Sequence, residues 1–363
     1  METFLRDIII SLCSTLAYEQ LAAFFSFLAH KRFCSEIGNG GNIDPMSLKN
    51  RESLAKVLSK ELYPRCIKAL DKRPVSPNDI NVAYALTEVY DYIGDGTKSA
   101  ILSEKILEAL KNSKPATMEH YIRYLIGCSY SLTIAKADDE MKCRYLQIAR
   151  VNFSKAKEQL ESSDIDLYMG KLSQLELWGL YYSDHAAYLV NSGKQSGSRR
   201  LREDFNNKAL EEYKLSKEKR ETAYNTSKRL CVWDNGSDGD DDWQNDSNRL
   251  IRLKSVIIKT NSNIASMAYR MGNYLEAIEA HEQVLQQWIE IGDQANIHLT
   301  KVYIIGSSIE LARIDESQIT ANLAKHVRKY LKDCCEYYKS SNDQERLKDV
   351  LEKQENWNCF QFS

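Results

Sequence analysis

The chain has 363 residues, of which 49 are lysine or arginine and 51 are aspartate or glutamate, so its formal net charge is −2 at pH 7. Charged residues make up 28% and hydrophobic residues 43%, a balance that fits a folded globular protein and excludes a disordered or fibrous one. The near-neutral charge argues against nucleic-acid binding over the whole surface. This length allows two ordinary domains or one continuous array of helices.

The first segment, residues 1–33, is apolar, but Arg6, Asp7 and Glu19 interrupt it. No uninterrupted run of about 20 apolar residues remains, which a membrane-spanning helix requires. We therefore expect a pair of buried amphipathic helices here, and neither a signal nor a membrane span.

Apolar residues recur with helical spacing along most of the chain, and no segment alternates apolar and polar residues for long enough to predict a sheet. All five prolines lie at or before Pro115, so the remaining two thirds can form long helices. Pro64 is expected to bend or divide one predicted helix, and Ser76 or Asn78 can cap the next. The helices are predicted at residues 3–29, 53–70, 80–93, 97–110, 118–135, 139–160, 166–189, 201–230, 248–271, 274–291, 294–312, 318–340 and 344–353. The predicted fold is all-α.

Shifts in composition divide the chain into five predicted parts. These are N-terminal helices at 1–75, a helical hairpin array at 76–232, an acidic loop at 233–248, further hairpins at 249–340, and a terminal helix and tail at 341–363.

The acidic loop has aspartates at alternate positions, as calcium-binding loops do, namely Asp238, Asp240 and Asp242. Trp243 and Arg249, however, stand where such a loop requires glycine and glutamate. We therefore expect an acidic insertion between helices and no metal site.

Residues 194–229, just before this loop, are rich in lysine and arginine but also contain many glutamates. That pattern predicts a solvated helix of mixed charge. Its basic start fits either an acidic partner or the protein's own acidic loop. Aromatic residues are not interleaved with the basic ones as a base-stacking platform. Nucleic acid is therefore not the expected partner of this chain.

The segment Gly272–Leu285 carries the most informative pattern. A tight turn at its glycine leads into a helix in which Ala277 allows a neighbour to approach closely, while His281 and Val284 fill the space beyond. Such a turn and helix cannot bury an apolar stripe alone, which implies stacked helical hairpins. The same spacing recurs at Ala149, Phe153 and Ala156 and at Ala209, Tyr213 and Ser216.

These residues resemble the tetratricopeptide repeat (TPR) family. The resemblance implies stacked antiparallel helical hairpins that form a TPR-like or 14-3-3-like α-α superhelix with a surface for binding protein.

The segment His120-Tyr121-Ile122-Arg123-Tyr124 resembles the arginine–tyrosine pair of 14-3-3 proteins. That resemblance, which spans the first two thirds of the chain, implies a groove that binds phosphoserine or phosphothreonine peptides through clustered basic side chains. Arg123 and Tyr124 are the residues that can be carried over.

Other positions depart from the 14-3-3 pattern. The family's remaining basic residues align with residues 85–95, where this chain has Glu88 and Asp95, and its groove asparagine aligns near Glu176. Acidic residues at these positions would repel a phosphate, so the shared fold does not by itself imply the shared ligand.

No catalytic or cofactor-binding motif is present in the sequence. The six histidines are dispersed, without the spacing of a metal site, and no nucleophile elbow or dinucleotide fingerprint occurs. The nine cysteines form no Cys-x-x-Cys pair, which favours reduced thiols in the cytoplasm, with the nucleus as the alternative. We expect no enzyme activity, no cofactor and no metal.

The leading prediction is a non-catalytic adaptor or scaffold that holds a peptide or a partner helix in the groove of a helical array. Two alternatives remain: a divergent 14-3-3-type phosphopeptide adaptor, and a regulatory subunit of a larger assembly, with or without RNA. The expected partner is a protein or peptide, with or without phosphate, and not a small-molecule substrate; self-association is left open. The candidate partner-binding residues are Arg123, Tyr124, Tyr130, Tyr181, Tyr182, Asn263, Tyr269 and Lys301.

Overall fold

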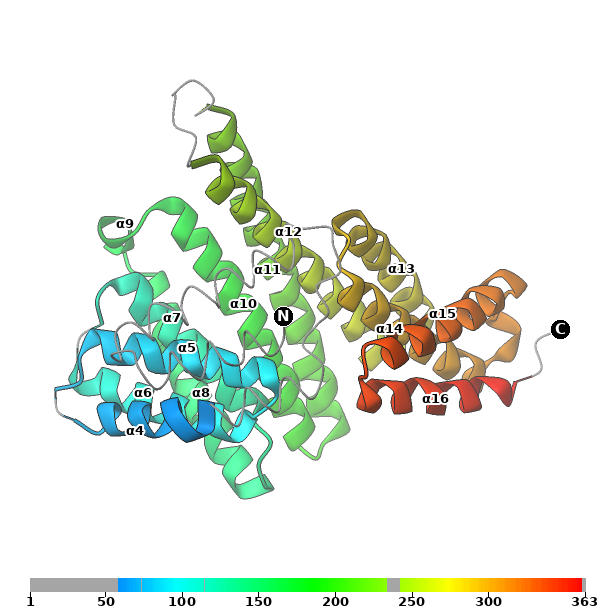
Figure 1. The fold of residues 1–363 in the computed structure, drawn as a ribbon, viewed down its shortest axis with the longest axis horizontal. Coiled ribbons are helices and arrows are strands. Elements are labelled where there is room, and N and C mark those ends of the chain that lie inside the picture. Colours follow the sequence, from blue (N-terminus) through cyan, green and yellow to red (C-terminus); the bar gives the residue numbers. More distant parts are fainter. Residues whose placement is uncertain (1–57, 73, 114, 234–241, 361–363) are drawn as a thin grey trace. The chain divides into compact units, whose positions relative to one another are not determined.

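The computed structural model describes residues 58–72, 74–113, 115–233 and 242–360 (Figure 1). Within these ranges every regular element is a helix and no strand is present, which confirms the predicted all-α fold. The helices predicted at 3–29 lie outside the described residues. The described chain separates into two compact units, unit 1 at 58–233 and unit 2 at 242–360, and each is treated by itself.

Unit 1 begins with a single π-helical segment and continues as eight α-helices. They are η1 (Leu58–Leu62), α4 (Tyr63–Leu70), α5 (Pro77–Ile93), α6 (Gly96–Asn112), α7 (Met118–Ile134), α8 (Asp139–Leu160), α9 (Ile165–Tyr168), α10 (Lys171–Gln195) and α11 (Arg199–Trp233). From α4 to α8 each helix packs against the next, and α10 packs against α7, α8 and α11. This neighbour-to-neighbour packing is the stacking that the repeat pattern predicts.

Local sequence signals account for most helix starts in unit 1. The predicted helix at 53–70 is divided at the expected place, because α4 starts at Tyr63 with Pro64 in its first turn. Ser76 caps α5, its side chain accepting a hydrogen bond from the Asp79 amide at 3.1 Å. Thr117 caps α7 in the same way.

One predicted helix, at 166–189, is wrong at its beginning. The short α9 ends at Tyr168, and the backbone of Met169 and Gly170 is extended before α10 starts at Lys171. The Met169 side chain is buried, and its carbonyl accepts a hydrogen bond from Gln174 Nε2 at 3.1 Å. These contacts stabilise the chain where the helical hydrogen bonds are interrupted. Apolar spacing alone does not reveal the interruption.

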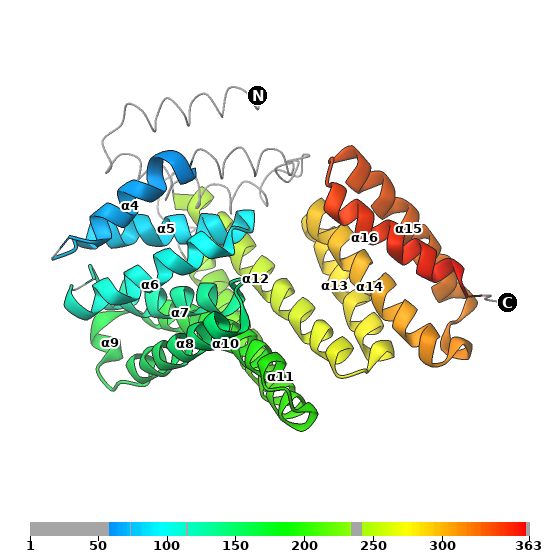
Figure 2. The same cartoon turned by 90° about the horizontal axis from the view of Figure 1, so that it is seen from below.

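Unit 2 contains α12 (Asp242–Arg270), α13 (Tyr274–Ile291), α14 (Gln294–Ile314), the 3-10 turn η2 (Glu316–Gln318), α15 (Ala321–Ser340) and α16 (Gln344–Asn358). Figure 2 shows α13, α14, α15 and α16 side by side, and each packs against the next. The first of these elements, α12, starts within the segment 233–248 that was predicted to be an acidic loop.

Two glycines make the tight turns on either side of α13. Gly272 and Gly292 have φ angles of 83° and 81°, in the left-handed region that other residues rarely adopt. The residues of the repeat pattern that follow Gly272 are buried, with exposed fractions of 0% for Ala277, 1% for His281 and 2% for Val284. The pattern therefore describes real packing positions.

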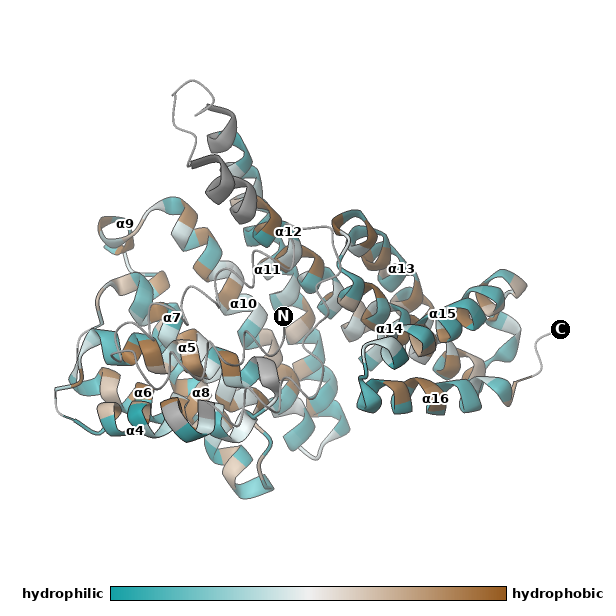
Figure 3. Cartoon of the chain, in the orientation of Figure 1, coloured by the Kyte–Doolittle hydropathy of each residue, from teal (hydrophilic) through white to brown (hydrophobic). Residues whose placement is uncertain are grey.

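Each unit has its own apolar core. Figure 3 shows hydrophobic and hydrophilic residues on different sides of the same helices, as burial against neighbouring helices requires. Phe153 and Leu177 belong to the core of unit 1, and Trp288 and Trp357 belong to the core of unit 2. No helix among the described residues is both long enough and apolar enough to cross a membrane.

Candidate functional site

Polar side chains form rows on two helices of unit 1. Tyr84, Glu88 and Asp91 follow one another at four- and three-residue intervals on α5, so they lie on one side of that helix. Arg123 and Tyr130 are related in the same way on α7. Charges on one row affect the other row. Arg123 on α7 lowers the pKa of Glu88 on α5, and Asp91 on α5 raises the pKa of Tyr130 on α7.

A glycine on α7 allows these two rows to approach. A Cβ atom at Gly127 would lie 2.2 Å from the hydroxyl oxygen of Tyr84, so a larger residue would collide with the tyrosine ring. The Tyr84 ring packs beside the Tyr124 ring, with centroids 4.8 Å apart. The Tyr84 hydroxyl also acts on the Glu88 carboxyl and lowers its pKa. The α5 row is thereby fixed against α7.

Helices α10 and α11 add a second charged pair, Asp184 and Arg220. Arg220 crosses α10 at Gly179, where a Cβ atom would lie 2.7 Å from its Cγ. Ser216 Oγ, one turn earlier on α11, donates a hydrogen bond of 2.7 Å to the Gly179 carbonyl. The negative charge of Asp184 raises the pKa of Tyr130, and the charges of Asp91 and Glu88 raise the pKa of Asp184. Helices α5 and α7 and helices α10 and α11 therefore contribute to one cluster.

Burial disfavours the ionised forms of the carboxyl groups in this cluster. It raises the pKa of Asp184 to about 7, against the attraction of Arg220, and the pKa of Asp91 to about 6. Burial also raises the pKa of Glu88, although hydrogen bonding from Tyr84 and the charge of Arg123 oppose this effect. Asp91 accepts a hydrogen bond from Ser131 Oγ at 2.5 Å on Oδ2.

Glu88 lies at the solvent-exposed edge of the cluster. Glu88 is exposed to solvent, yet burial among surrounding protein atoms raises the pKa of its carboxyl. We call this cluster the unit 1 face and define it by Glu88, Asp91, Arg123, Tyr130, Asp184 and Arg220.

Of the residues that the 14-3-3 resemblance singles out, one lies on the unit 1 face and the other is mainly a packing residue. Arg123 Nη2 donates to Glu119 Oε1 at 3.2 Å, so its positive charge already has a carboxylate partner. Tyr124 is 2% exposed, and its hydroxyl donates to Asn81 Oδ1 at 2.7 Å.

Tyr130 belongs to the unit 1 face, whereas the two tyrosines predicted on α10 join an aromatic cluster. Tyr181 is 3% exposed and stacks on His185 with ring centroids 5.3 Å apart. Tyr182 is half-buried and stacks on Trp178 at 5.2 Å. Burial favours a packing role for Tyr181.

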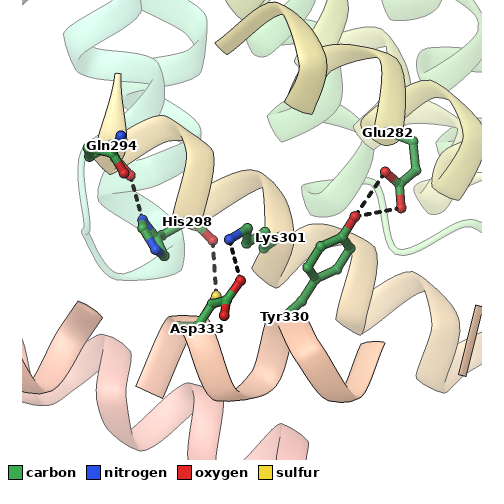
Figure 4. A network of polar contacts seen from close by, with 7 residues as sticks. Glu282, Gln294, His298, Lys301, Tyr330 and Asp333 are labelled. Carbon is green, nitrogen blue, oxygen red and sulfur yellow. Dashed lines mark hydrogen bonds and ion pairs between the residues drawn. The ribbon is translucent and has the colours of Figure 1, made fainter. Parts of the chain in front are cut away.

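The other three predicted residues, Asn263, Tyr269 and Lys301, belong to unit 2. Lys301 is one member of the polar network in Figure 4. Its Nζ lies 2.7 Å from Asp333 Oδ2 and 5.6 Å from the centroid of the Tyr330 ring. The Tyr330 hydroxyl donates to the Glu282 carboxylate, with oxygen–oxygen distances of 3.1 and 3.2 Å. These contacts tie α15 to both α14 and α13, which favours a structural role for Lys301.

A histidine and a thiol at one end of the same network are held in non-reactive states. His298 Nδ1 lies 2.7 Å from the Gln294 carbonyl oxygen, and the ring stacks on Tyr337 with centroids 3.9 Å apart. Burial lowers the pKa of His298 and raises the pKa of the Cys334 thiol to about 12. A thiol with such a pKa is protonated at neutral pH and is a poor nucleophile.

The last two candidates lie on α12. Asn263 is half-buried, and Tyr269 is 38% exposed and meets the edge of Tyr274 at a centroid distance of 5.3 Å. Across the described part of the chain, no group of three or more histidine, cysteine, aspartate or glutamate side chains is arranged to hold a metal ion.

Sequence reasoning missed Asp91, Asp184 and Arg220 as members of a site. Asp91 had a weak signal, because it is a charged residue between Tyr90 and Tyr92, whereas Arg220 stands between Lys219 and Glu221 in a charged stretch and had none. Gly127 in α7 and Gly179 in α10 leave space for Tyr84 and Arg220, which the sequence spacing does not reveal.

The fold and this site define an all-α protein of stacked, repeat-like helical hairpins. No protein family model and no curated protein matches the chain. Among solved structures, the chain is similar to a circular tandem repeat protein with novel repeat topology and enhanced subunit contact surfaces. That similarity has 16% sequence identity and a TM-score of 0.25, and it covers 98% of this chain and 84% of the other.

Proposed function

We propose that this protein is a non-catalytic, cytoplasmic adaptor or scaffold that holds a segment of another protein on the unit 1 face. The observation that supports this proposal is the cluster to which α5, α7, α10 and α11 each contribute a charged side chain. Packed helices hold such side chains in position before a partner arrives, which reduces the entropy lost on binding.

The TPR and 14-3-3 resemblances would place this adaptor among helical-hairpin proteins that bind peptides. A 14-3-3-type phosphopeptide function would use Arg123 to bind the phosphate. Glu119 already pairs with Arg123 at 3.2 Å, and Glu88 also interacts with it. Because phosphate would be repelled by these carboxylates, we propose a segment without phosphate as the partner.

A peptide-library selection on the full chain tests the adaptor proposal. Enriched peptides would be measured against wild type, Glu88→Lys on the unit 1 face, and Lys155→Glu, which reverses an exposed charge on α8. We expect Glu88→Lys to weaken binding by about tenfold or more, because it reverses a charge within the cluster, and Lys155→Glu to change it little. Failure to enrich any peptide, or equal binding by all three proteins, would contradict the proposal.

The phosphopeptide alternative is tested with the same peptides. Each enriched peptide that contains serine or threonine would also be synthesised in phosphorylated form. Tighter binding of the phosphorylated forms, lost on Arg123→Ala, would support the 14-3-3-type alternative instead.

A further inference from the structure

Unit 2 carries a surface of unbalanced charge on α15, separate from the unit 1 face. We propose that this surface binds an acidic helix of a partner protein, so that the chain has a second protein-binding site. We call the surface the α15 ridge and define it by Lys325, Arg328, Lys329, Lys332 and Lys339.

The exposed charges of α15 are almost all positive. All five side chains of the ridge are exposed, and Glu336 is the one carboxylate of this helix that is exposed with them. The whole chain has 49 basic and 51 acidic residues, so this excess of positive charge is local. A ligand with several carboxylates would therefore meet net attraction on the ridge.

Most cations of the ridge lack the ion pairs that other helices of this chain provide. Pairs one turn apart on α11 include Arg199–Glu203, Lys208–Asp204 and Lys214–Glu211. The ridge has one such pair, Lys332–Glu336, at 3.9 Å. Lys325, Arg328 and Lys329 form no ion pair with any described residue. Their charges are therefore available to a partner.

Neighbouring cations of the ridge also repel one another. Lys325 precedes Arg328 by three residues and Lys329 by four, and Lys332 follows these two at intervals of four and three. Side chains at such intervals lie side by side on a helix, where like charges are destabilising. The carboxylates of a partner would relieve this repulsion, which gives an acidic ligand a second favourable contribution.

The opposite side of α15 is fixed in unit 2, so the ridge is held facing solvent. Val327, Leu331 and Cys334 are buried in the core of unit 2. Asp333 and Tyr330 bond to side chains of α14 and α13, as Figure 4 shows. The helix therefore presents its basic side before a partner arrives, which reduces the entropy lost on binding.

Helices with acidic surfaces lie beside the ridge. Helix α13 has no lysine or arginine, and its Glu282 accepts a hydrogen bond from Tyr330 of α15 at 3.1 Å. The exposed charges of α13 are Glu276, Glu279 and Glu290. Helix α16 packs against α15, and its exposed charges are Glu345, Lys348, Asp349, Glu352 and Glu355.

These acidic neighbours favour a narrow ligand. Packed helices lie only about 8–10 Å apart, and a membrane surface or a nucleic-acid duplex is wider than that. Such a surface would also approach the carboxylates of α13 and α16, which would repel its phosphates. A single helix can follow the ridge alone, so we infer a protein partner.

A helical partner also matches the spacing of the ridge. The ridge extends over about 21 Å, or about four turns, at about 1.5 Å per residue. A partner helix with carboxylates at intervals of three and four residues repeats its charges at the same distances. Each lysine or arginine can then meet a carboxylate in a charge-assisted hydrogen bond.

The experiment measures binding of fluorescein-labelled peptides to the full chain by fluorescence anisotropy. Each peptide has about 18 residues, enough to cover the ridge as a helix. The first is an alanine peptide with glutamates at intervals of three and four residues, on one side of the helix. The second replaces these glutamates with glutamine, and the third spreads the same number of glutamates around the helix.

The test variant combines Lys325→Gln, Lys329→Gln and Lys332→Gln, and glutamine has about the same helix propensity as lysine. The control combines Lys155→Gln, Lys208→Gln and Lys214→Gln, which removes three exposed positive charges from α8 and α11. Both variants have the same net charge. Circular dichroism confirms that each is folded.

At low salt we expect the one-sided glutamate peptide to bind at least about tenfold more tightly than either of the other peptides. The test variant should lose about tenfold or more of this affinity, and the control should stay within about twofold of wild type. Binding should weaken as salt is added, because the ridge is exposed. Glu88→Lys in unit 1 should have no effect, which separates this site from the unit 1 face.

Three outcomes would overturn the proposal. Equal binding of the three peptides, or equal losses in the test and control variants, would reject recognition by the ridge. Tighter binding of a DNA duplex or of phosphatidylserine vesicles than of the peptide, lost in the test variant, would assign the ridge to nucleic acid or membrane instead. Self-association of the wild type that the test variant lacks, measured by light scattering, would make a second copy of the chain the partner.

Discussion

At the scale of single residues, His281 in unit 2 shows most directly how burial changes chemistry. Its side chain is buried, its Nδ1 has no hydrogen-bond partner among the described residues, and its ring lies 5.3 Å from that of Tyr303. Burial lowers the pKa of His281 to about 4 from 6.5. The folded protein therefore holds this imidazole neutral over a pH range in which the unfolded chain protonates it.

This difference predicts an acid-sensitive contribution to the stability of unit 2. Since the folded-state pKa lies below the unfolded-state value, the contribution is complete above about pH 6.5 and is lost as the pH falls towards 4. The loss amounts to about 3 kcal/mol, because one pKa unit corresponds to about 1.4 kcal/mol. In His281→Leu this part of the pH dependence should disappear.

Urea unfolding at pH 7 and pH 4.5 measures the effect as a change in the free energy of unfolding. His326→Leu, at a partly exposed histidine of the same unit, is the control and should keep the wild-type pH dependence. Equal pH dependence in wild type and His281→Leu would show that the buried imidazole is not responsible.

At the scale of helices, unit 1 depends on close approach of α10 and α11 at Gly179. The Arg220 side chain occupies the space that a Cβ would fill, and Ser216 binds the Gly179 carbonyl. Gly179→Ala should destabilise unit 1 by about 1–3 kcal/mol, since overpacking forces the nearer part of Arg220 to move. Gly306→Ala in α14 is the matched control, because the nearest atom to its added Cβ would be 3.7 Å away, an ordinary contact.

Thermal unfolding followed by circular dichroism distinguishes the two alanine variants. The control should be neutral or more stable by up to about 1 kcal/mol, as expected when alanine replaces glycine inside a helix. If Gly179→Ala were equally stable, the close approach of the two helices would not matter energetically.

The network between α13, α14 and α15 supports a second prediction at this scale. Asp333→Ala leaves the Lys301 ammonium, which is 13% exposed, without its carboxylate partner at 2.7 Å. We expect a loss of about 1–3 kcal/mol in the free energy of unfolding, because a largely buried charge without a partner is costly. The neighbouring pair Lys332–Glu336 is separated by 3.9 Å and its side chains are 77% and 69% exposed.

Glu336→Ala is therefore the control on the same helix. A surface ion pair contributes about 0–1 kcal/mol, so this variant should unfold nearly as the wild type does. Equal losses in Asp333→Ala and Glu336→Ala, measured by urea denaturation, would mean that Lys301 finds another partner or is solvated at little cost.

Helices were predictable from the sequence to the extent that local signals define them. Apolar spacing and the Gly272 turn placed α13 at residues 274–291, with the bounds that the structure has. The interruption before Lys171 was missed, because its compensation comes from burial of Met169 and from Gln174. Local periodicity contains no information on either contact.

The candidate site was less predictable, since it depends on pairs that are distant in the chain. Lys301 was predicted to bind a partner protein, but it pairs with Asp333, which lies 32 positions further on. The Arg123–Tyr124 motif was visible in the sequence. The sequence did not show that only Arg123 reaches the unit 1 face. Sequence spacing indicates which side of a helix a residue occupies, but not which helix lies opposite.

At the scale of the whole molecule, the described chain consists of two units with separate apolar cores. Phe153 is 1% exposed in the core of unit 1, and Trp288 is 2% exposed in the core of unit 2. The binding face of the proposed adaptor lies wholly in unit 1. A destabilising substitution in the core of unit 2 can therefore show whether the unit 1 face depends on the stability of unit 2.

Trp288→Ala should cost about 3–5 kcal/mol within unit 2, as large-to-small changes in a core do. Hydrogen exchange followed by mass spectrometry should then show faster exchange in peptides from α13 to α15, with wild-type protection from α5 to α8. Phe153→Ala should give the reverse pattern. Loss of protection throughout the chain in both variants would mean that the two cores unfold as one cooperative unit, and that the unit 1 face can be regulated by any change that destabilises α12–α16.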